Sequence, residues 1–258
     1  MKLYNQKISY LNLNIRYNRI PLLVVLLVMA GSQLALFYHD LAGMTFEITM
    51  NYQEPTPWAP RFENLLSANY FPQIYYAAFF LVFALIATIP IRQNMNSKGR
   101  LTLLRLPLKR STQFGLHVFS SIVTLFFVFV TELITILIGF KLYQHMVPVE
   151  LQMNNAFFLA VLRSSFLRVL LPITNLAYFT YRIFFFVGIS FSAAFLGLCL
   201  QTKHGYGKVI ATILLFLVAT NMERDAKLGN LIFSACLALL LWSMAHKLKL
   251  YLYHETNA

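Results

Sequence analysis

The chain contains few acidic residues. Asp and Glu together number 9 among 258 residues, against 21 Lys and Arg, so the formal net charge is +12. Membrane enzymes that bind a diphosphate through magnesium need clustered carboxylates, and no pair of acids stands inside any apolar segment. This scarcity argues against metal-dependent catalysis, and we expect neither a catalytic residue nor a metal ligand.

Sequence motifs of other catalytic classes are missing as well. The zinc-protease pattern H-E-x-x-H and the hydrolase pattern G-x-S-x-G do not occur. The phosphate-binding pattern G-x-x-x-x-G-K-[ST] is also absent, because Gly205–Lys208 lacks the first glycine at the required distance. The cysteines Cys199 and Cys236 show no metal-ligand spacing. We therefore expect no cofactor in this chain and no ATP hydrolysis by it.

Charge of either sign is scarce. Charged residues make up 12% of the chain and hydrophobic residues 59%, with a mean hydropathy of +0.63. A soluble domain has about 25% charged residues, and no soluble fold of this length could bury so much apolar surface. The basic residues gather in loops, where the positive-inside rule places them, rather than marking a nucleic-acid surface. The sequence predicts an all-α, multi-pass integral membrane protein with no nucleic-acid partner.

Six apolar segments are separated by polar loops. Cytoplasmic loops carry an excess of Lys and Arg, which places both termini and the basic loop 92–113 inside. We expect a single transmembrane domain over residues 1–258. Its spans are predicted at 20–38, 71–91, 114–140, 183–200, 209–222 and 228–246, and its external loops at 39–70 and 141–182.

The N-terminal segment 1–19 is basic and interleaves apolar with polar side chains. We expect an interfacial helix that leads into the first span. A cleaved signal peptide is the alternative, with Val28-Met29-Ala30 as a weak cleavage pattern. The apolar stretch is longer than a signal core, which favours an uncleaved span. In the external loop that follows, apolar and polar residues alternate from Phe46 to Tyr52, which predicts a short strand.

The external segment 141–182 is apolar but contains Arg163, Arg168 and Arg182. A full span here would bury arginines at a cost of about 2.5–3.5 kcal/mol each. A segment that dips into the outer leaflet lets them reach the headgroups. We expect a dipping segment, although a span remains the alternative.

Glu132 is the only acid inside a predicted span. An intramembrane carboxylate is costly, so it faces a cavity or a partner. One interpretation makes Glu132 a gating or substrate-path residue, together with Arg163, Arg168 and Arg182. The other is a structural ion pair between Glu132 and one of those arginines.

The loop 92–113 carries six Lys and Arg and no acid. Its residues Leu101, Leu104 and Leu108 are spaced by three and four, which places them on one face of a helix. A short amphipathic helix on the cytoplasmic side needs a surface to pack against. A cytoplasmic partner subunit is the natural candidate.

The run GRLTLLRLPLKR at residues 99–110 resembles the cytoplasmic loop of type-2 ABC-transporter permeases. That loop reads, loosely, Gly-x-Leu, then Leu-Leu, then Leu-Pro and a basic residue, between the second and third spans. The resemblance implies a coupling helix that seats in a groove of a separate ATPase subunit. The residues that would make this contact are Arg100, Leu101, Leu104, Arg105, Pro107, Lys109 and Arg110.

The same resemblance implies the membrane subunit of a bacterial ABC exporter in the cytoplasmic membrane. Two copies, or one copy and a related permease, would form the pathway among the membrane lipids. Two ATPase subunits would supply ATP and Mg, and the substrate would be an amphiphile such as an antimicrobial peptide, drug or lipid. An intramembrane enzyme of unrecognised type and a non-transporting sensor or assembly partner remain the alternatives.

The loop charges generate a topology prediction. We expect residues 39–70 and 141–181 to face outside, and residues 92–113 and 201–208 to face inside. Single cysteines introduced into a chain with Cys199 and Cys236 changed to Ser, and labelled on intact cells, measure this. Labelling of position 98 by an impermeant reagent would overturn the topology.

Overall fold

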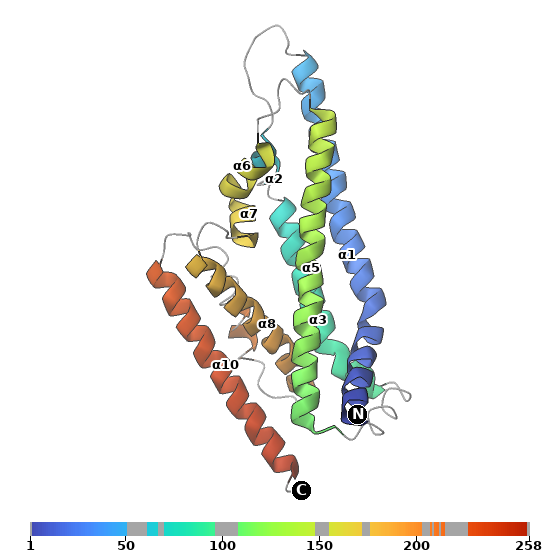
Figure 1. Cartoon of the computed structure of the whole chain (residues 1–258), viewed down its shortest axis with the longest axis vertical. Coiled ribbons are helices and arrows are strands. Elements are labelled where there is room, and N and C mark those ends of the chain that lie inside the picture. Colours follow the sequence, from blue (N-terminus) through green and yellow to red (C-terminus); the bar gives the residue numbers. More distant parts are fainter. Residues whose placement is uncertain are drawn as a thin grey trace. The chain divides into compact units, whose positions relative to one another are not determined.

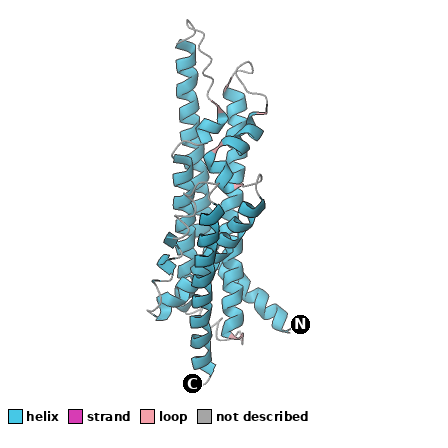
Figure 2. Ribbon diagram, turned by 90° about the vertical axis from the view of Figure 1, so that its left-hand side faces the viewer, coloured by secondary structure: helices cyan, strands magenta, loops and turns pink. Residues whose placement is uncertain are grey.

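The computed structural model describes residues 2–50, 61–66, 70–95, 108–147, 155–171, 176–202, 207, 209–211, 213–214 and 227–256. Within these ranges the chain is almost entirely helical, and no strand occurs (Figures 1 and 2). The prediction of an all-helical protein is therefore confirmed for the described residues. The helical content follows from long runs of residues that hydrogen-bond their own backbone, as an apolar environment demands.

Among the described residues, four helices are long and apolar enough to cross a membrane. The stretches that meet this criterion are Gln6–Gly43, Phe62–Gln93, Ser111–Met146 and Phe179–Gly197. They lie on helices α1 (Lys2–Met50), α3 (Tyr70–Met95) with the short helix α2 (Phe62–Leu66) before it, α5 (Arg110–Met146) and α8 (Leu176–Thr202). This supports a membrane protein.

The first helix differs from the sequence prediction in two ways. Residues 1–19 were expected to form a separate interfacial segment, but α1 continues from Lys2 to Met50 without a break and contains Pro21. The predicted strand is wrong over residues 46–50, which are helical. Extending an existing helix costs far less than starting one, and no Gly or Pro lies between Gly43 and Met50 to stop it. Residues 51 and 52 lie outside the described residues.

Two short helices occupy the segment that was expected to dip into the outer leaflet. Helix α6 (Ala156–Arg163) begins after Asn155, whose φ of 61° is left-handed, and α7 (Ser165–Leu170) follows directly. Ser164 is extended and separates them, and its side chain accepts a hydrogen bond from the backbone N–H of Leu167. At ~1.5 Å per residue neither helix is long enough to span a membrane.

The C-terminal part of the chain is described in pieces. Helix α10 (Lys227–Thr256) contains the predicted span 228–246. Most of the predicted span 209–222 lies outside the described residues, which include only 209–211 and 213–214 there. The number of spans and the side of each terminus therefore remain predictions.

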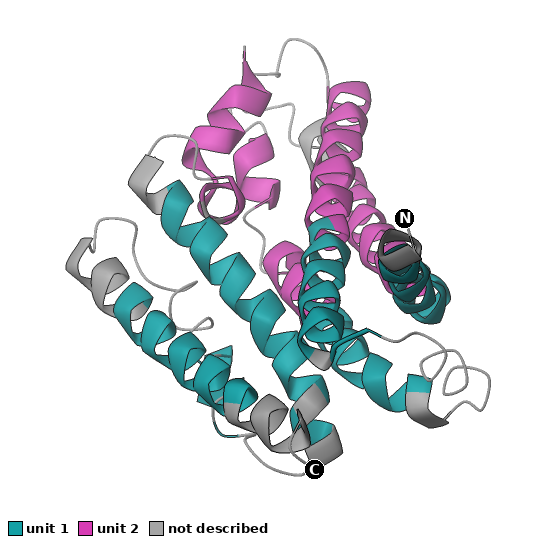
Figure 3. Cartoon of the chain, turned by 60° about the horizontal axis from the view of Figure 1, so that its bottom comes forward, with its two compact units in different colours: residues 1–23, 81–126, 177–258 teal, residues 24–80, 127–176 magenta. Residues whose placement is uncertain are grey.

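The chain divides into two compact units (Figure 3). Unit 1 comprises residues 1–23, 81–126 and 177–258, and unit 2 comprises residues 24–80 and 127–176. The boundary between the units therefore crosses α1, α3 and α5, and each unit contains one end of each of these helices.

Unit 1 contains a close approach of α8 to α3. A Cβ atom added at Gly197 would lie 2.9 Å from Cγ of Pro90 and 3.1 Å from the carbonyl oxygen of Ala87. Small residues at membrane-helix interfaces allow such contact. A Cβ added at Gly31, in contrast, would meet nothing within 4 Å.

This geometry predicts opposite effects of the same substitution at two glycines. Gly197→Ala should destabilise the protein by about 1–3 kcal/mol, because the methyl group meets backbone and a rigid ring. Gly31→Ala should be neutral or stabilising by up to ~1 kcal/mol, since alanine is the better helix former. Thermal unfolding of the detergent-purified variants measures both, and an undisturbed Gly197→Ala would refute the close α3–α8 contact.

Candidate functional site

Glu132 lies inside the apolar part of α5 and is fully buried. At ~1.5 Å per residue it stands about 21 Å from the helix end at Met146. The helix continues through this position because the residues around it are apolar and contain no Pro. The carboxyl group is thus held far from either end of the helix.

The hydrogen-bond partner of Glu132 comes from α1. The side-chain amide of Gln33 donates to Oε1 of Glu132 at 3.0 Å and to the backbone carbonyl of Phe71 at 3.1 Å. Gln33 is itself fully buried. Because Phe71 belongs to α3, one amide group joins three helices of unit 2. We call Gln33, Glu132 and the Phe71 carbonyl the polar joint.

Two oxygen atoms of the polar joint have no hydrogen-bond partner. These are Oε2 of Glu132 and Oε1 of Gln33, both shielded from solvent. A buried polar atom without a partner costs about 1–3 kcal/mol. A protonated carboxyl group would carry no net charge and would offer an O–H donor. The joint therefore has the capacity to take up a proton or another donor.

The sequence left open whether Glu132 forms an ion pair with an arginine. Over the described residues Glu132 forms no ion pair, and Arg163 instead lies 3.7 Å from Oε1 of Glu63. The reason is local, because α6, which carries Arg163, packs on α2, which carries Glu63. Arg168 lies on α7, also in unit 2, and Arg182 lies on α8 in unit 1.

Sequence reasoning missed both Gln33 and Glu63. Gln33 is the one amide within the apolar stretch 20–38, and that isolation was the available signal. Glu63 was assigned to an external loop, whereas its side chain is only 10% exposed. A loop acid gives no sequence signal of burial, since burial follows from the packing of α2 and α6.

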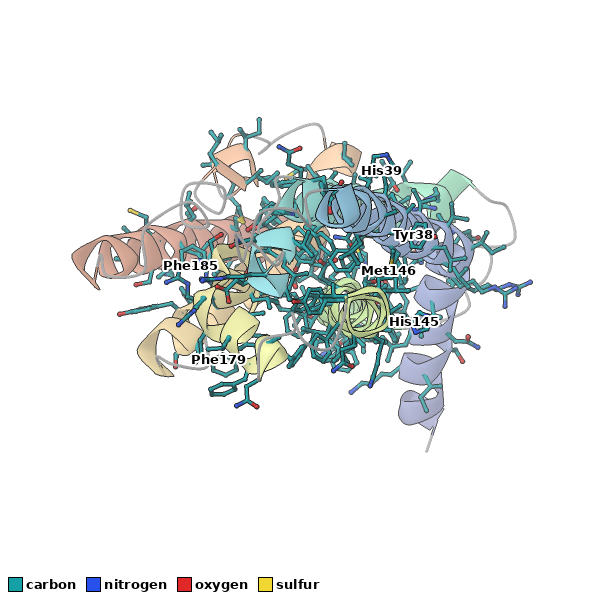
Figure 4. The ribbon with its side chains drawn as sticks, turned by 90° about the horizontal axis from the view of Figure 1, so that it is seen from above. Tyr38, His39, His145, Met146, Phe179 and Phe185 are labelled. Atoms are coloured by element: carbon teal, nitrogen blue, oxygen red, sulfur yellow. The ribbon has the colours of Figure 1, made fainter. Side chains whose placement is uncertain are left out.

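An aromatic cluster joins α1, α2, α3 and α5 in unit 2. The ring of Phe37, one turn from Gln33 on α1, lies edge-on to those of Phe62 and Phe71, each at 6.0 Å. The Phe62 ring in turn lies 5.2 Å from Phe140 and 5.4 Å from Tyr143. Such packing excludes water from the helix interface. Figure 4 labels four other residues on these helices, which are Tyr38 and His39 on α1 and His145 and Met146 on α5.

A second set of polar contacts joins α1 to α3 in unit 1. Arg92 donates to the carbonyl of Leu85 at 2.8 Å, to Oγ1 of Thr88 at 2.9 Å and to Oδ1 of Asn18 at 3.3 Å. Beside it, the amide of Gln93 donates to Oδ1 of Asn14. Arg92 thus holds two helices together, in addition to contributing to the charge of the loop that follows.

His117 lies about two turns after the start of α5 at Arg110. It is buried on α5 in unit 1, and neither ring nitrogen has a hydrogen-bond partner. The neighbouring hydroxyls of Ser121 and Thr124 donate to backbone carbonyls of α5 itself. No cluster of three His, Cys, Asp or Glu side chains suited to a metal occurs among the described residues.

The residues of the predicted coupling helix are only partly described. Arg100, Leu101, Leu104, Arg105 and Pro107 lie outside the described residues. Lys109 is exposed and Arg110 opens α5. Leu108 is buried, and its carbonyl accepts a hydrogen bond from the side chain of Gln113 at 3.2 Å.

Comparisons of the chain with protein-family models, with curated proteins and with solved structures give no match. The function therefore has to be argued from the residues themselves.

The polar joint generates a stability prediction. In a double-mutant cycle, Gln33→Ala and Glu132→Ala should show a coupling energy of about 1 kcal/mol, within the range measured for hydrogen bonds between membrane helices. Glu132→Gln should keep most of the stability, because an amide has the shape of the neutral acid and can still accept from Gln33.

The exposed pair Lys141 and Gln144, whose side chains lie 3.4 Å apart, provides the matched control cycle. Its coupling should not exceed a few tenths of a kcal/mol. Unfolding in detergent measures both cycles. Equal coupling energies in the two cycles would show that the contact between Gln33 and Glu132 does not stabilise the protein.

Proposed function

We propose that this chain is the membrane subunit of a bacterial ABC exporter and is driven by a separate ATPase. The observation that carries the proposal is the basic run at 98–110, with its leucine spacing and Leu-Pro-Leu-Lys-Arg ending. This run connects α3 to α5, two helices with stretches apolar and long enough to cross a membrane. A coupling helix requires that position, because it must pass motion of the ATPase to membrane helices.

The proposed layout has six spans with both termini in the cytoplasm. Helices α1, α3, α5 and α8 supply four of them, α10 supplies the last, and residues 209–222 supply the fifth. Two copies of the chain, or one copy with a related permease, form the pathway in the cytoplasmic membrane. Each binds one ATPase subunit, which holds the ATP and Mg.

In this proposal the polar joint lies on the route from the ATPase to the pathway. The coupling loop continues directly into α5, and α5 carries Glu132. A shift of α5 relative to α1 or α3 changes the contacts of Gln33, and Oε2 of Glu132 has no partner to hold it in place. Glu132 therefore serves as a gating residue. The many aromatic side chains suit an amphiphilic substrate such as a peptide, drug or lipid.

The proposal predicts that the chain purifies together with an ATPase subunit. Changing Leu101 and Leu104 together to Asp should remove the ATPase, because two carboxylates cannot enter an apolar groove without large desolvation cost. Affinity purification of the tagged chain, followed by an ATP hydrolysis assay, measures this.

The matched control is a double Asp substitution at Gln201, near the end of α8, and Tyr206, both in the segment 201–208 that is predicted to be cytoplasmic. That variant should keep the ATPase. If the Leu101 and Leu104 variant also keeps it at full strength, the coupling-helix assignment is wrong.

A further inference from the structure

Two arginines of unit 2 converge on one buried carboxylate oxygen. NH1 of Arg61 lies 3.8 Å and NH1 of Arg163 lies 3.7 Å from the same Oε1 atom of Glu63. Arg61 directly precedes α2, Glu63 lies in its first turn, and Arg163 ends α6, which packs against α2 (Figure 1). Residues distant in sequence thus place two positive groups around one negative group, which leaves a net charge of +1.

The guanidinium groups keep donors available. A charge-assisted hydrogen bond between a guanidinium and a carboxylate has a length of about 2.7–2.9 Å, so contacts of 3.7 and 3.8 Å leave N–H groups free to bind another anion. The side chains of Arg61 and Arg163 are 52% and 54% exposed, whereas that of Glu63 is 10% exposed. Glu63 therefore contacts the two guanidinium groups from the protein interior, and about half of each arginine side chain remains exposed.

The cluster lies near the ends of two helices that are long enough to cross a membrane. Glu63 is the second residue of the candidate span Phe62–Gln93. The neighbouring Phe62 ring contacts Phe140 and Tyr143, which belong to the last two turns of the candidate span Ser111–Met146. At ~1.5 Å per residue these spans are longer than a hydrocarbon core of about 30 Å, so their ends reach the headgroup layer or extend beyond it.

Helix α6 has the character of an interfacial helix. Ala160 is fully buried, and the ring of Phe157 packs on that of Phe140 at 5.2 Å. Phe158, in contrast, is 63% exposed, and Arg163 follows at the end of the same helix. A helix with an exposed aromatic side chain and a terminal arginine suits the boundary between acyl chains and headgroups.

We propose that Arg61 and Arg163 bind the phosphate of an anionic lipid headgroup, with Glu63 as the group that positions them. Arginine is well suited because its planar fork donates two parallel hydrogen bonds to phosphate oxygens. The net positive charge of the cluster favours an anionic headgroup over a zwitterionic one. Phe158 contacts the acyl region beside it. This proposal does not depend on the transport function proposed above.

The test is a titration of the full chain in detergent with phosphatidylglycerol, phosphatidylcholine or inorganic phosphate, followed by thermal unfolding. Phosphatidylglycerol should raise the unfolding midpoint at the lowest concentration. The Arg61→Gln, Arg163→Gln double variant should bind it at least about tenfold more weakly, which corresponds to the loss of one or two charge-assisted hydrogen bonds.

Two further variants keep the outcome decisive. The triple variant Arg61→Gln, Glu63→Gln, Arg163→Gln avoids leaving a buried carboxylate without a counter-charge, so it should fold even where the double variant does not, and it should show the same loss. Arg16→Gln with Arg19→Gln removes the same charge from exposed positions on α1 and should leave the affinity unchanged.

Three results would overturn the proposal. Equal losses in the Arg16, Arg19 variant would show general charge attraction, and unchanged affinity in the triple variant would show that the cluster is only structural. Equal stabilisation by inorganic phosphate would identify a site for a soluble anion and exclude a lipid site.

Discussion

The packing of unit 2 depends on a single side-chain amide. Gln33 donates to a carboxylate on α5 and to a carbonyl on α3 from its own position on α1. Among apolar surroundings a polar group has to find its partner within the protein. The positions of Gln33, Phe71 and Glu132 along their helices therefore fix how these three helices are aligned with one another. The aromatic rings around Phe37 and Phe62 then exclude water from the contact.

Both units use polar side chains to join α1 to α3, but with different chemistry. Unit 2 uses a neutral amide and a carboxyl group, and two of its oxygens have no partner. Unit 1 uses the guanidinium of Arg92, which makes several hydrogen bonds to backbone and side-chain oxygens, and the amide pair of Gln93 and Asn14. Unit 1 also has buried polar atoms without a partner, which are Nε of Arg92 and the side-chain nitrogens of Asn14 and Asn18. Unmet hydrogen bonds therefore do not distinguish the two contacts. The contact in unit 2 differs in that it contains a carboxyl group, that of Glu132, for which the gating role is proposed.

The proximity of Arg61, Glu63 and Arg163 on and beside the short helices α2 and α6 is only weakly indicated by the sequence. Arg61 and Glu63 read as loop residues, and Arg163 reads as one of several arginines in an apolar segment. Their convergence arises because α6 is too short to span and folds back onto α2. The cost of burying an arginine, which argued against a span at 141–182, is thus avoided by leaving Arg163 half exposed beside an acid.

The sequence by itself predicted the class of the protein, because its composition and long apolar runs are typical of a helical membrane protein. The four long apolar helices among the described residues support this class. It also located the long helices α3, α5 and α8, since apolar runs have clear limits. The largest difference is at the start of α8, which begins at Leu176 instead of Ile183. It identified Glu132 as unusual, because one acid in an apolar run needs no structure to be noticed.

Only the tertiary structure decided which side chains Glu132 and Arg163 contact. One interpretation of the sequence paired Glu132 with an arginine on the ground of opposite charge. In the structure Glu132 accepts a hydrogen bond from Gln33, and Arg163 lies beside Glu63. Opposite charge is a long-range preference, whereas a hydrogen bond requires two atoms about 3 Å apart. Which atoms come that close depends on how helices pack, and residues 33 and 132 are too far apart in the chain for any local pattern to show it.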